Sequence, residues 1–197
     1  MDHGSLLALI AFAFVSSVTP GPNNLMLMAS GANFGLRRTL PHMLGVGIGF
    51  SLMIFLVGVG LVGLFALWPP AFTLLKVVGV AYMLWLAWKI ANAEPPASAD
   101  PDSGGKPMTF LQAALFQWVN PKAWTMALTS VTVYAPDRDI AAITLVTFVF
   151  GAINLPTVSC WATLGTVMRR WLTNRARLRA FNWSMAGLLV ASLVVMI

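Results

Sequence analysis

Apolar residues run along this chain in long blocks, not in alternating or amphipathic stripes. Six blocks are long enough for a bilayer-crossing helix, which needs about 20 residues. They cover residues 5–32, 42–67, 71–91, 109–134, 140–167 and 180–197. A stretch rich in Pro, Ser, Asp and Gly separates the third block from the fourth, as is typical of a linker. The pattern predicts an all-α integral membrane protein with six transmembrane helices: a three-helix unit at 1–91, a linker at 92–108 and a second three-helix unit at 109–197.

Composition supports this class of protein. The chain is 58% hydrophobic and 9% charged, whereas a soluble domain carries about 25% charged residues. The single cysteine, Cys160, excludes an intramolecular disulfide and a zinc site made of several thiolates. No Lys or Arg precedes the first apolar block, which argues against a cleaved signal peptide.

The cations lie mostly on alternate connections, which share one side of a membrane. Cytoplasmic loops collect Lys and Arg, so the unequal distribution predicts a cytoplasmic linker and both termini outside. It also explains the net charge of +6 without a nucleic-acid partner. The predicted cytoplasmic cations are Arg37, Arg38, Lys89, Lys106, Arg169, Arg170, Arg175, Arg177 and Arg179, against Lys76 and Arg138 on the other side.

Two of the blocks contain residues that interrupt a helix. The first contains Thr19-Pro20-Gly21-Pro22-Asn23-Asn24, and the fourth contains Gln117-Trp118-Val119-Asn120-Pro121-Lys122. Proline cannot continue a helix and disfavours the α conformation of the residue before it. The two predicted units have opposite orientations, and each has its break in its first span. Interrupted spans at matching positions of inverted repeats indicate a transporter binding site, here near the bilayer midplane.

A broken helix offers binding groups for both ends of a zwitterion. The N–H groups after Pro20, Pro22 and Pro121 favour an anion such as a carboxylate. The carbonyls before each break favour a cation such as an ammonium. An amino acid is the simplest such ligand, and the amide side chains of Asn23, Asn24, Gln117 and Asn120 could orient it. The alternative is that the prolines only kink the helices.

Lys122 is the one charged residue expected deep inside a span, and such residues are usually functional. We expect it to add a full positive charge beside the carboxylate. All six acidic residues fall in connections, so neither a carboxylate proton relay nor a hard-metal site is expected. Asn154 and Pro156 suggest a third break, in the fifth block; they either line the cavity or form a plain kink. His42 is expected to be structural, with a proton-shuttle role as the alternative.

The stretch Thr19-Pro20-Gly21-Pro22-Asn23-Asn24 resembles the signature of the LysE/RhtB family of amino-acid exporters, whose six hydrophobic segments match the number here. The segments Gly45–Phe50, Ala81–Ala91, Gln117–Lys122 and Cys160-Trp161 are most similar to the cysteine/O-acetylserine exporter branch. The resemblance places the family's motifs on Thr19–Asn24 and Asn120–Lys122. It implies export of amino acids or derivatives from a bacterial cytoplasm, driven by the proton gradient. Some members have an acidic residue where this chain has Phe50, which disfavours a dibasic substrate.

These observations predict a multi-pass exporter of small neutral amino acids in the bacterial inner membrane, without cofactor, metal or enzymatic activity. The leading substrates are cysteine and O-acetylserine. The substrate-binding candidates are Thr19, Pro20, Gly21, Pro22, Asn23, Asn24, Gln117, Asn120, Pro121 and Lys122, with Asn154 and Pro156 as candidate cavity residues. Export of homoserine, threonine, a basic amino acid or a metal ion, and a non-transporting scaffold, are the alternatives. The glycines and the basic loop permit a homodimer without requiring one.

Overall fold

The computed structural model describes residues 1–61, 63, 68, 70–93 and 106–194. Its regular elements are all helices, ordered as follows: α1 (His3–Val18), α2 (Pro22–Phe34), α3 (Leu36–Leu56), η1 (Val57–Leu61), α5 (Pro70–Ala91), α6 (Phe110–Phe116), η2 (Gln117–Val119), α7 (Pro121–Tyr134), α8 (Ile140–Met168) and α9 (Arg175–Val194). Most of the predicted linker, residues 94–105, lies outside the described residues.

Both predicted breaks are present, and each is set by proline. Helix α1 ends at Val18, Gly21 is extended, and Pro22 is the first residue of α2. The axes of α1 and α2 differ by 52°. In the second break, Asn120 is extended between η2 and α7, and Pro121 begins α7. Proline suits the first position of a helix because its missing N–H would have no partner there.

The third suggested break, at Asn154 and Pro156, is absent from the structure. Helix α8 runs without interruption from Ile140 to Met168, with Pro156 inside it. Proline removes one hydrogen bond from a helix but does not by itself end it. In this chain, a helix ends at the sequence Pro20-Gly21-Pro22 and another ends at Asn120-Pro121. The single Pro156 lies inside a helix that continues past it.

Three described helical segments are long and apolar enough to cross a membrane: Leu36–Leu61, Thr73–Ala91 and Ile140–Met168. The bent pair α1 and α2 makes a fourth if it is counted as one span. The fourth expected block instead forms shorter helices, namely α6 with η2 and then α7. The described helices therefore form an all-helical protein with three to four membrane-capable spans. Large apolar side chains such as Phe148, 72% exposed, cover its outside.

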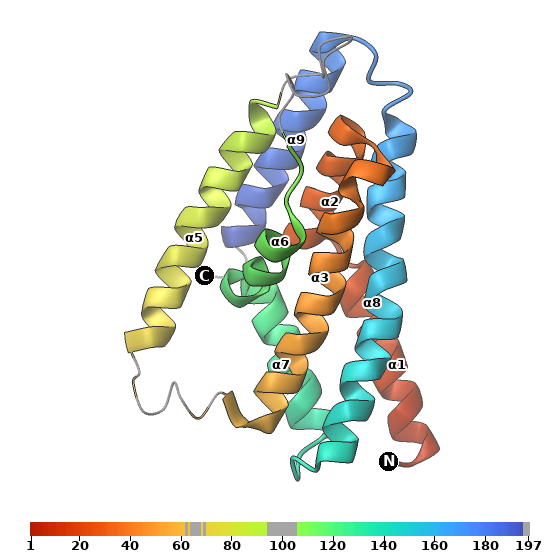
Figure 1. Cartoon of the computed structure of the whole chain (residues 1–197), viewed down its shortest axis with the longest axis vertical. Coiled ribbons are helices and arrows are strands. Elements are labelled where there is room, and N and C mark those ends of the chain that lie inside the picture. Colours follow the sequence, from red (N-terminus) through yellow and green to blue (C-terminus); the bar gives the residue numbers. More distant parts are fainter. Residues whose placement is uncertain (62, 64–67, 69, 94–105, 195–197) are drawn as a thin grey trace.

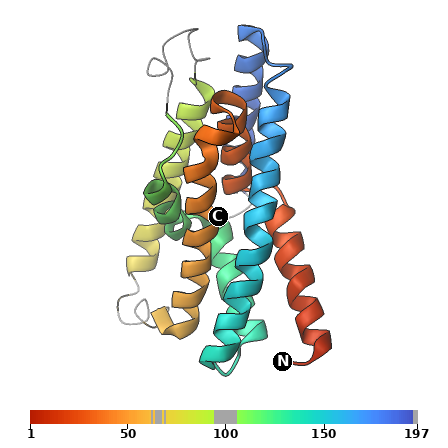
Figure 2. The same ribbon diagram turned by 45° about the vertical axis from the view of Figure 1, so that its right-hand side comes forward.

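Helix α8 packs against α1, α2 and α3, while α5 pairs with α9 (Figures 1 and 2). Glycines permit the closest approaches. A Cβ at Gly31 would meet the α8 backbone, and one at Gly165 would meet the α2 backbone. Gly45 and Gly49 likewise allow the backbone of α6 to pack closely against α3. Small residues let helices in membranes pack closely in this way.

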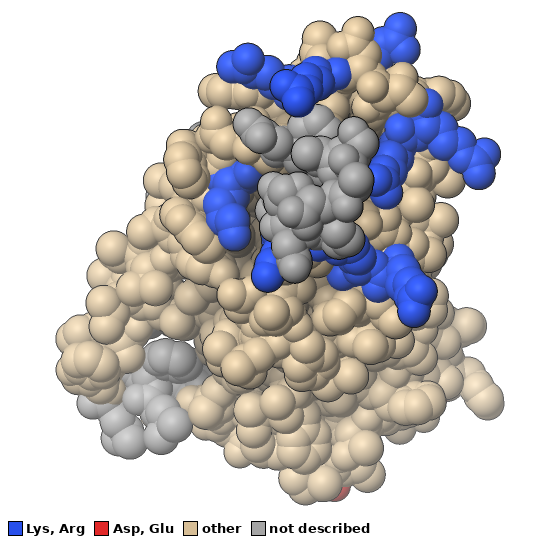
Figure 3. Space-filling model, turned by 45° about the horizontal axis from the view of Figure 1, so that its top comes forward, with Lys and Arg blue, Asp and Glu red and all other residues tan. Residues whose placement is uncertain are grey.

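One end of the bundle collects most of the positive charge. The C-terminal ends of α2, α5 and α8 and the N-terminal ends of α3 and α9 meet there (Figure 1). Nine of the twelve Lys and Arg residues belong to these ends or their connections. Figure 3 shows them gathered on this face, which we call the basic end. Asp2 and Asp139, the N-caps of α1 and α8, mark the helix starts at the opposite end.

Candidate functional site

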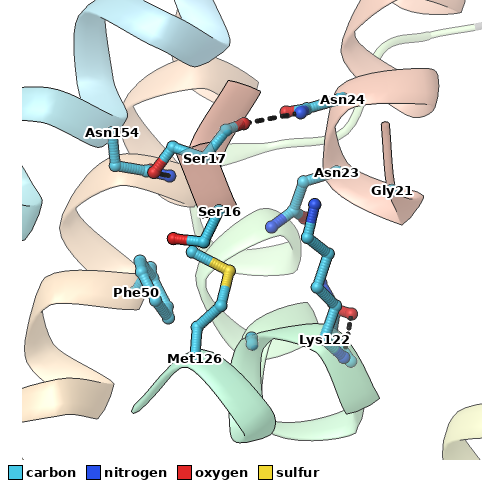
Figure 4. A pocket seen from close by; sticks show the side chains of 11 residues that line it. Ser16, Ser17, Gly21, Asn23, Asn24, Phe50, Lys122, Met126 and Asn154 are labelled. Carbon is cyan, nitrogen blue, oxygen red and sulfur yellow. Dashed lines mark hydrogen bonds between the residues drawn. The ribbon is translucent and has the colours of Figure 1, made fainter. Parts of the chain in front are cut away.

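The two breaks meet around a narrow cavity inside the bundle. It holds about 310 Å³ of empty space, counted with its opening. Its lining comes from α1, α2, α3, α7, α8 and the break residues (Figure 4). The lining residues are Ser16, Ser17, Gly21, Asn23, Asn24, Phe50, Asn120, Lys122, Ala123, Met126 and Asn154.

The first break leaves the N-terminus of α2 without a side-chain cap. Gly21 occupies the capping position and has no side chain to accept from the first N–H groups of α2. The amide of Asn24 donates to the carbonyl oxygens of Ser17 and Thr19, at 2.8 and 3.0 Å. The chain therefore binds its own carbonyls at this break but leaves the positive end of the helix dipole uncapped.

A pair of amide side chains joins the two breaks. The amide nitrogen of Asn23 donates to Gln117 Oε1 at 2.8 Å, and the amide nitrogen of Gln117 donates to Asn23 Oδ1 at 3.2 Å. Gln117 is fully buried and also donates to the carbonyl of Ala113. These bonds satisfy both amides and hold α2 against η2.

Lys122 extends from α7 toward Asn23 and the first break (Figure 4). Its ammonium donates to the carbonyl oxygen of Thr19 at 2.6 Å, and the carbonyl of Pro20 lies at 3.5 Å. The stem passes so close to Gly21 that a Cβ there would lie 2.6 Å from Lys122 Cδ. Glycine at position 21 therefore makes room for the lysine, and the lysine occupies the carbonyls that could bind another ammonium.

The second break is closed by its own side chains. Asn120 Oδ1 accepts from the backbone N–H of Lys122 at 3.1 Å and so caps α7. The indole N–H of Trp124 donates to the carbonyl of Trp118 at 2.7 Å. This break contributes side chains to the cavity, but its helix N-terminus is already capped.

Asn154 reaches the cavity from α8, opposite Lys122 (Figure 4). Its amide nitrogen donates to Ser17 Oγ at 3.2 Å. Its Oδ1 is buried and has no hydrogen-bond partner within the described part of the chain. A buried acceptor without a partner is costly, so this oxygen is a candidate for binding a donor group of a ligand.

The structure brings six of the sequence-predicted residues to the cavity: Gly21, Asn23, Asn24, Asn120, Lys122 and Asn154. Gln117 contributes through Asn23, and Thr19 and Pro20 through their carbonyls. Pro22 and Pro121 begin helices, whereas Pro156 is exposed and does not line the cavity.

Sequence reasoning did not name five residues as part of the lining: Ser16, Ser17, Phe50, Ala123 and Met126. The two serines stand directly before the first break, and that position was the available signal. Within the described residues, no group of three or more His, Cys, Asp and Glu side chains could hold a metal ion.

Comparison with known proteins agrees with this arrangement. A model of the family described as "LysE type translocator" matches residues 14–196. A "Cysteine/O-acetylserine efflux protein" of Klebsiella pneumoniae subsp. pneumoniae is 31% identical over 186 residues, which are 93% of this chain and 92% of that protein. The chain belongs to the LysE type translocator family.

Two further relatives are also named "Cysteine/O-acetylserine efflux protein". The Salmonella typhimurium protein is 32% identical over 168 residues, and the Escherichia coli K12 protein is 29% identical over 167 residues. Each match covers 84% of both chains. No solved structure matches this chain.

Membership of the LysE family confirms the expectation of a transport protein and not an enzyme. Together with the apolar helices, it identifies a multi-pass protein of the inner membrane.

Proposed function

We propose that this chain exports small neutral amino acids or their derivatives from the bacterial cytoplasm, with cysteine and O-acetylserine as the leading substrates. The name shared by the relatives from Klebsiella, Salmonella and Escherichia supports this substrate class. The observation that carries the proposal is the cavity at the breaks, which offers groups suited to both ends of an amino acid.

The carboxylate of the substrate would bind at the N-terminus of α2. This helix end has no side-chain cap, because Gly21 occupies the capping position. A helix N-terminus presents N–H donors and the positive end of the dipole, which together favour an anion. The ammonium of Lys122 lies beside Gly21 and supplies a full positive charge.

The ammonium of the substrate would bind at the opposite wall. Asn154 Oδ1 is a buried acceptor without a partner in the described chain. Ser16 and Ser17, which precede the break, line the same side. A bound ammonium would give the Asn154 oxygen the donor that it lacks, and hydrogen bonds to charged groups are the stronger ones.

Lys122 would move when substrate binds. Its ammonium donates a hydrogen bond to the carbonyl of Thr19 at 2.6 Å. A carboxylate beside Gly21 would compete for this ammonium, because an ion pair is stronger than a bond to a neutral carbonyl. Binding would thus weaken a contact that joins α7 to the first break, which is the kind of change that can permit two halves to shift.

The proposed transport cycle uses six spans arranged as inverted halves, 1–91 and 109–197, joined by the linker 92–108. The halves would rock about the midplane cavity. The gathering of cations at one end supports a cytoplasmic basic end with both termini outside. The proton gradient is the proposed energy source.

Flux measurements test this function. Purified protein in liposomes is loaded with labelled L-cysteine, O-acetyl-L-serine or L-lysine, and a proton gradient is imposed. We expect cysteine and O-acetylserine to leave faster than lysine, and faster with the gradient than without it. Efflux of lysine alone, or no efflux from folded protein, would overturn the proposal.

Asn154→Leu tests the ammonium site directly. We expect the half-saturating cysteine concentration to rise about ten-fold, as for loss of one hydrogen bond to a charged group. Thr163→Val is the matched control, because Thr163 lies on the same helix, is exposed and bonds only to its own helix backbone. Equal kinetics for Asn154→Leu and wild type would remove Asn154 from the site.

A further inference from the structure

A second, larger cavity lies at the basic end and takes no part in the site above. It holds about 1050 Å³ of empty space, counted with its opening. Helix α2 lines it from Met26 to Phe34, α3 contributes His42, and the end of α5 and residues 106–108 complete the wall. The space could hold a small molecule, and its polar groups limit the chemistry of that molecule.

His42 is the unexplained polar group in this wall. Its side chain is 1% exposed, and neither ring nitrogen has a hydrogen-bond partner within the described residues. A neutral imidazole carries one N–H donor and one acceptor. Leaving both buried without partners costs free energy, and such a group in a native protein requires an explanation.

The neighbouring polar side chains are already paired. Ser30 and Thr39 share a hydrogen bond of 2.9 Å. Asn33 and Asn182 exchange two amide bonds, at 2.8 and 3.2 Å. Among the buried polar residues that line this wall, Ser30, Asn33 and His42, only His42 has no hydrogen-bond partner within the described part of the chain.

Three polar side chains of α2 fall on one side of the helix, between the two cavities. Asn23, Ser30 and Asn33 fall within about 80° of one another around the helix, given about 100° per residue. Asn23 lines the cavity at the breaks, whereas Ser30 and Asn33 line the cavity at the basic end. The ten residues from Asn23 to Asn33 span about 15 Å along the helix. The polar residues of this face of α2 thus extend from the cavity at the basic end to the cavity at the breaks.

Charge at the cavity favours an anion. Lys89 and Lys106 belong to the lining, and none of its described residues is acidic. Lys89 is exposed, and its ammonium lies 4.9 Å from the centre of the Trp85 ring. The surrounding basic end adds further positive charge (Figure 3), and such a field concentrates anions near it.

We propose that this cavity is an access site for the exported solute, where His42 donates a hydrogen bond to the solute's carboxylate under the attraction of Lys89 and Lys106. The solute then passes along the polar face of α2 to the cavity at the breaks. The inference rests on the proposed export of amino acids and adds a second binding site on the cytoplasmic half of the path.

Inverted membrane vesicles provide the test, since their cytoplasmic face meets the bath. Initial uptake of labelled L-cysteine is measured over a range of bath concentrations. His42→Phe removes donor and acceptor at similar volume, and His42→Gln restores both. We expect KM to rise about ten-fold in His42→Phe and about two-fold in His42→Gln, with kcat nearly unchanged, as for loss and partial recovery of one bond to a charged group.

The exposed lysines Lys89 and Lys106 supply a variant that leaves the buried packing intact. Lys89→Gln combined with Lys106→Gln should raise KM about three-fold, as expected for loss of exposed charges. Lys76→Gln is the matched control: an exposed lysine on the same helix, α5, about 20 Å from Lys89 toward the other end. If Lys76→Gln raised KM as much as the double variant Lys89→Gln/Lys106→Gln, the proposed access site would be wrong.

The outcomes separate this inference from the proposed function. If wild-type vesicles take up cysteine, and Lys122→Met abolishes uptake while the His42 variants and the Lys89/Lys106 double variant keep a normal KM, the access site is wrong and the function stands. If wild-type vesicles take up no cysteine, the proposed function itself fails. If the effect of the double variant disappears in liposomes of phosphatidylcholine alone, the cavity binds an anionic lipid headgroup instead, which also overturns the access site.

Discussion

The two breaks occupy corresponding places in the two halves of the sequence but contribute different chemistry. The first break exposes backbone: the N-terminus of α2 is uncapped at Gly21, and the carbonyls of Thr19 and Pro20 face Lys122. The second break is self-contained, because Asn120 caps α7 and a short 3₁₀ turn precedes it. Its contribution to the cavity is made by side chains.

Two breaks of similar sequence type can therefore offer different binding groups, one through its backbone and the other through its side chains. The first break provides binding groups that no substitution can remove directly, because they belong to the backbone. The second provides Gln117 and Lys122, which bond to groups of the first break across more than 90 residues of sequence. We therefore expect substitutions in the second break to act through the first.

The largest expected effect is that of Lys122→Met, which removes the charge but keeps most of the stem. Cysteine efflux should fall about 100-fold, because a hydrogen bond to a charged group is worth up to about 3 kcal/mol. Lys76→Met, at an exposed lysine of α5, should leave efflux unchanged. Wild-type efflux in folded Lys122→Met would mean that the first break works without the second.

Gly21→Ala is expected to reduce efflux about ten-fold, within the range for overpacking by one methyl group. Gly21 has extended backbone, φ −170°, which alanine adopts freely. The added Cβ would lie 2.6 Å from Lys122 Cδ and displace the lysine. The double variant Gly21→Ala/Lys122→Met should therefore show the same efflux as Lys122→Met alone, because both substitutions act through the same lysine. Additive losses would contradict this account.

The matched control for that substitution is Gly187→Ala in α9. Apart from atoms of its own helix backbone and chain neighbours, no heavy atom of the described residues lies within 4 Å of the Cβ that alanine would add there. Its efflux and melting temperature should equal those of the wild type.

The smallest expected effect is that of Asn120→Ala, which removes the side-chain cap of α7. Loss of an N-cap costs about 1 kcal/mol, so the melting temperature should fall by a few degrees and efflux by about five-fold. Asn120→Ser retains a capping oxygen and should behave as the wild type. If both variants lose all efflux, Asn120 binds substrate directly and the second break is less closed than its geometry indicates.

Local sequence was sufficient to locate both breaks and, of the six expected spans, the three to four that are membrane-capable among the described helices. Pro20, Pro22 and Pro121 act on their immediate neighbours, so their effect can be read without knowing the rest of the fold. Hydropathy likewise depends on nearby composition. The same local reasoning left open whether Pro156 breaks its helix or only kinks it, because whether a helix continues past one proline depends on the packing around it; in the structure the helix continues.

Contacts between distant residues could not be read in this way. Whether Lys122 meets a carboxylate or the carbonyl of Thr19 depends on how α7 is rotated and how closely it approaches α1. The unpartnered oxygen of Asn154 and the isolated ring of His42 are likewise consequences of which helix faces meet.

The sequence alone determined where the helices break and which end carries the positive charge, because proline sterics and charge counts are local properties. Tertiary structure decided which break remains uncapped, which side chains satisfy it and where cavities remain. Those outcomes depend on helix rotation and separation, which are set by close packing at sites such as Gly31 and Gly165 between α2 and α8.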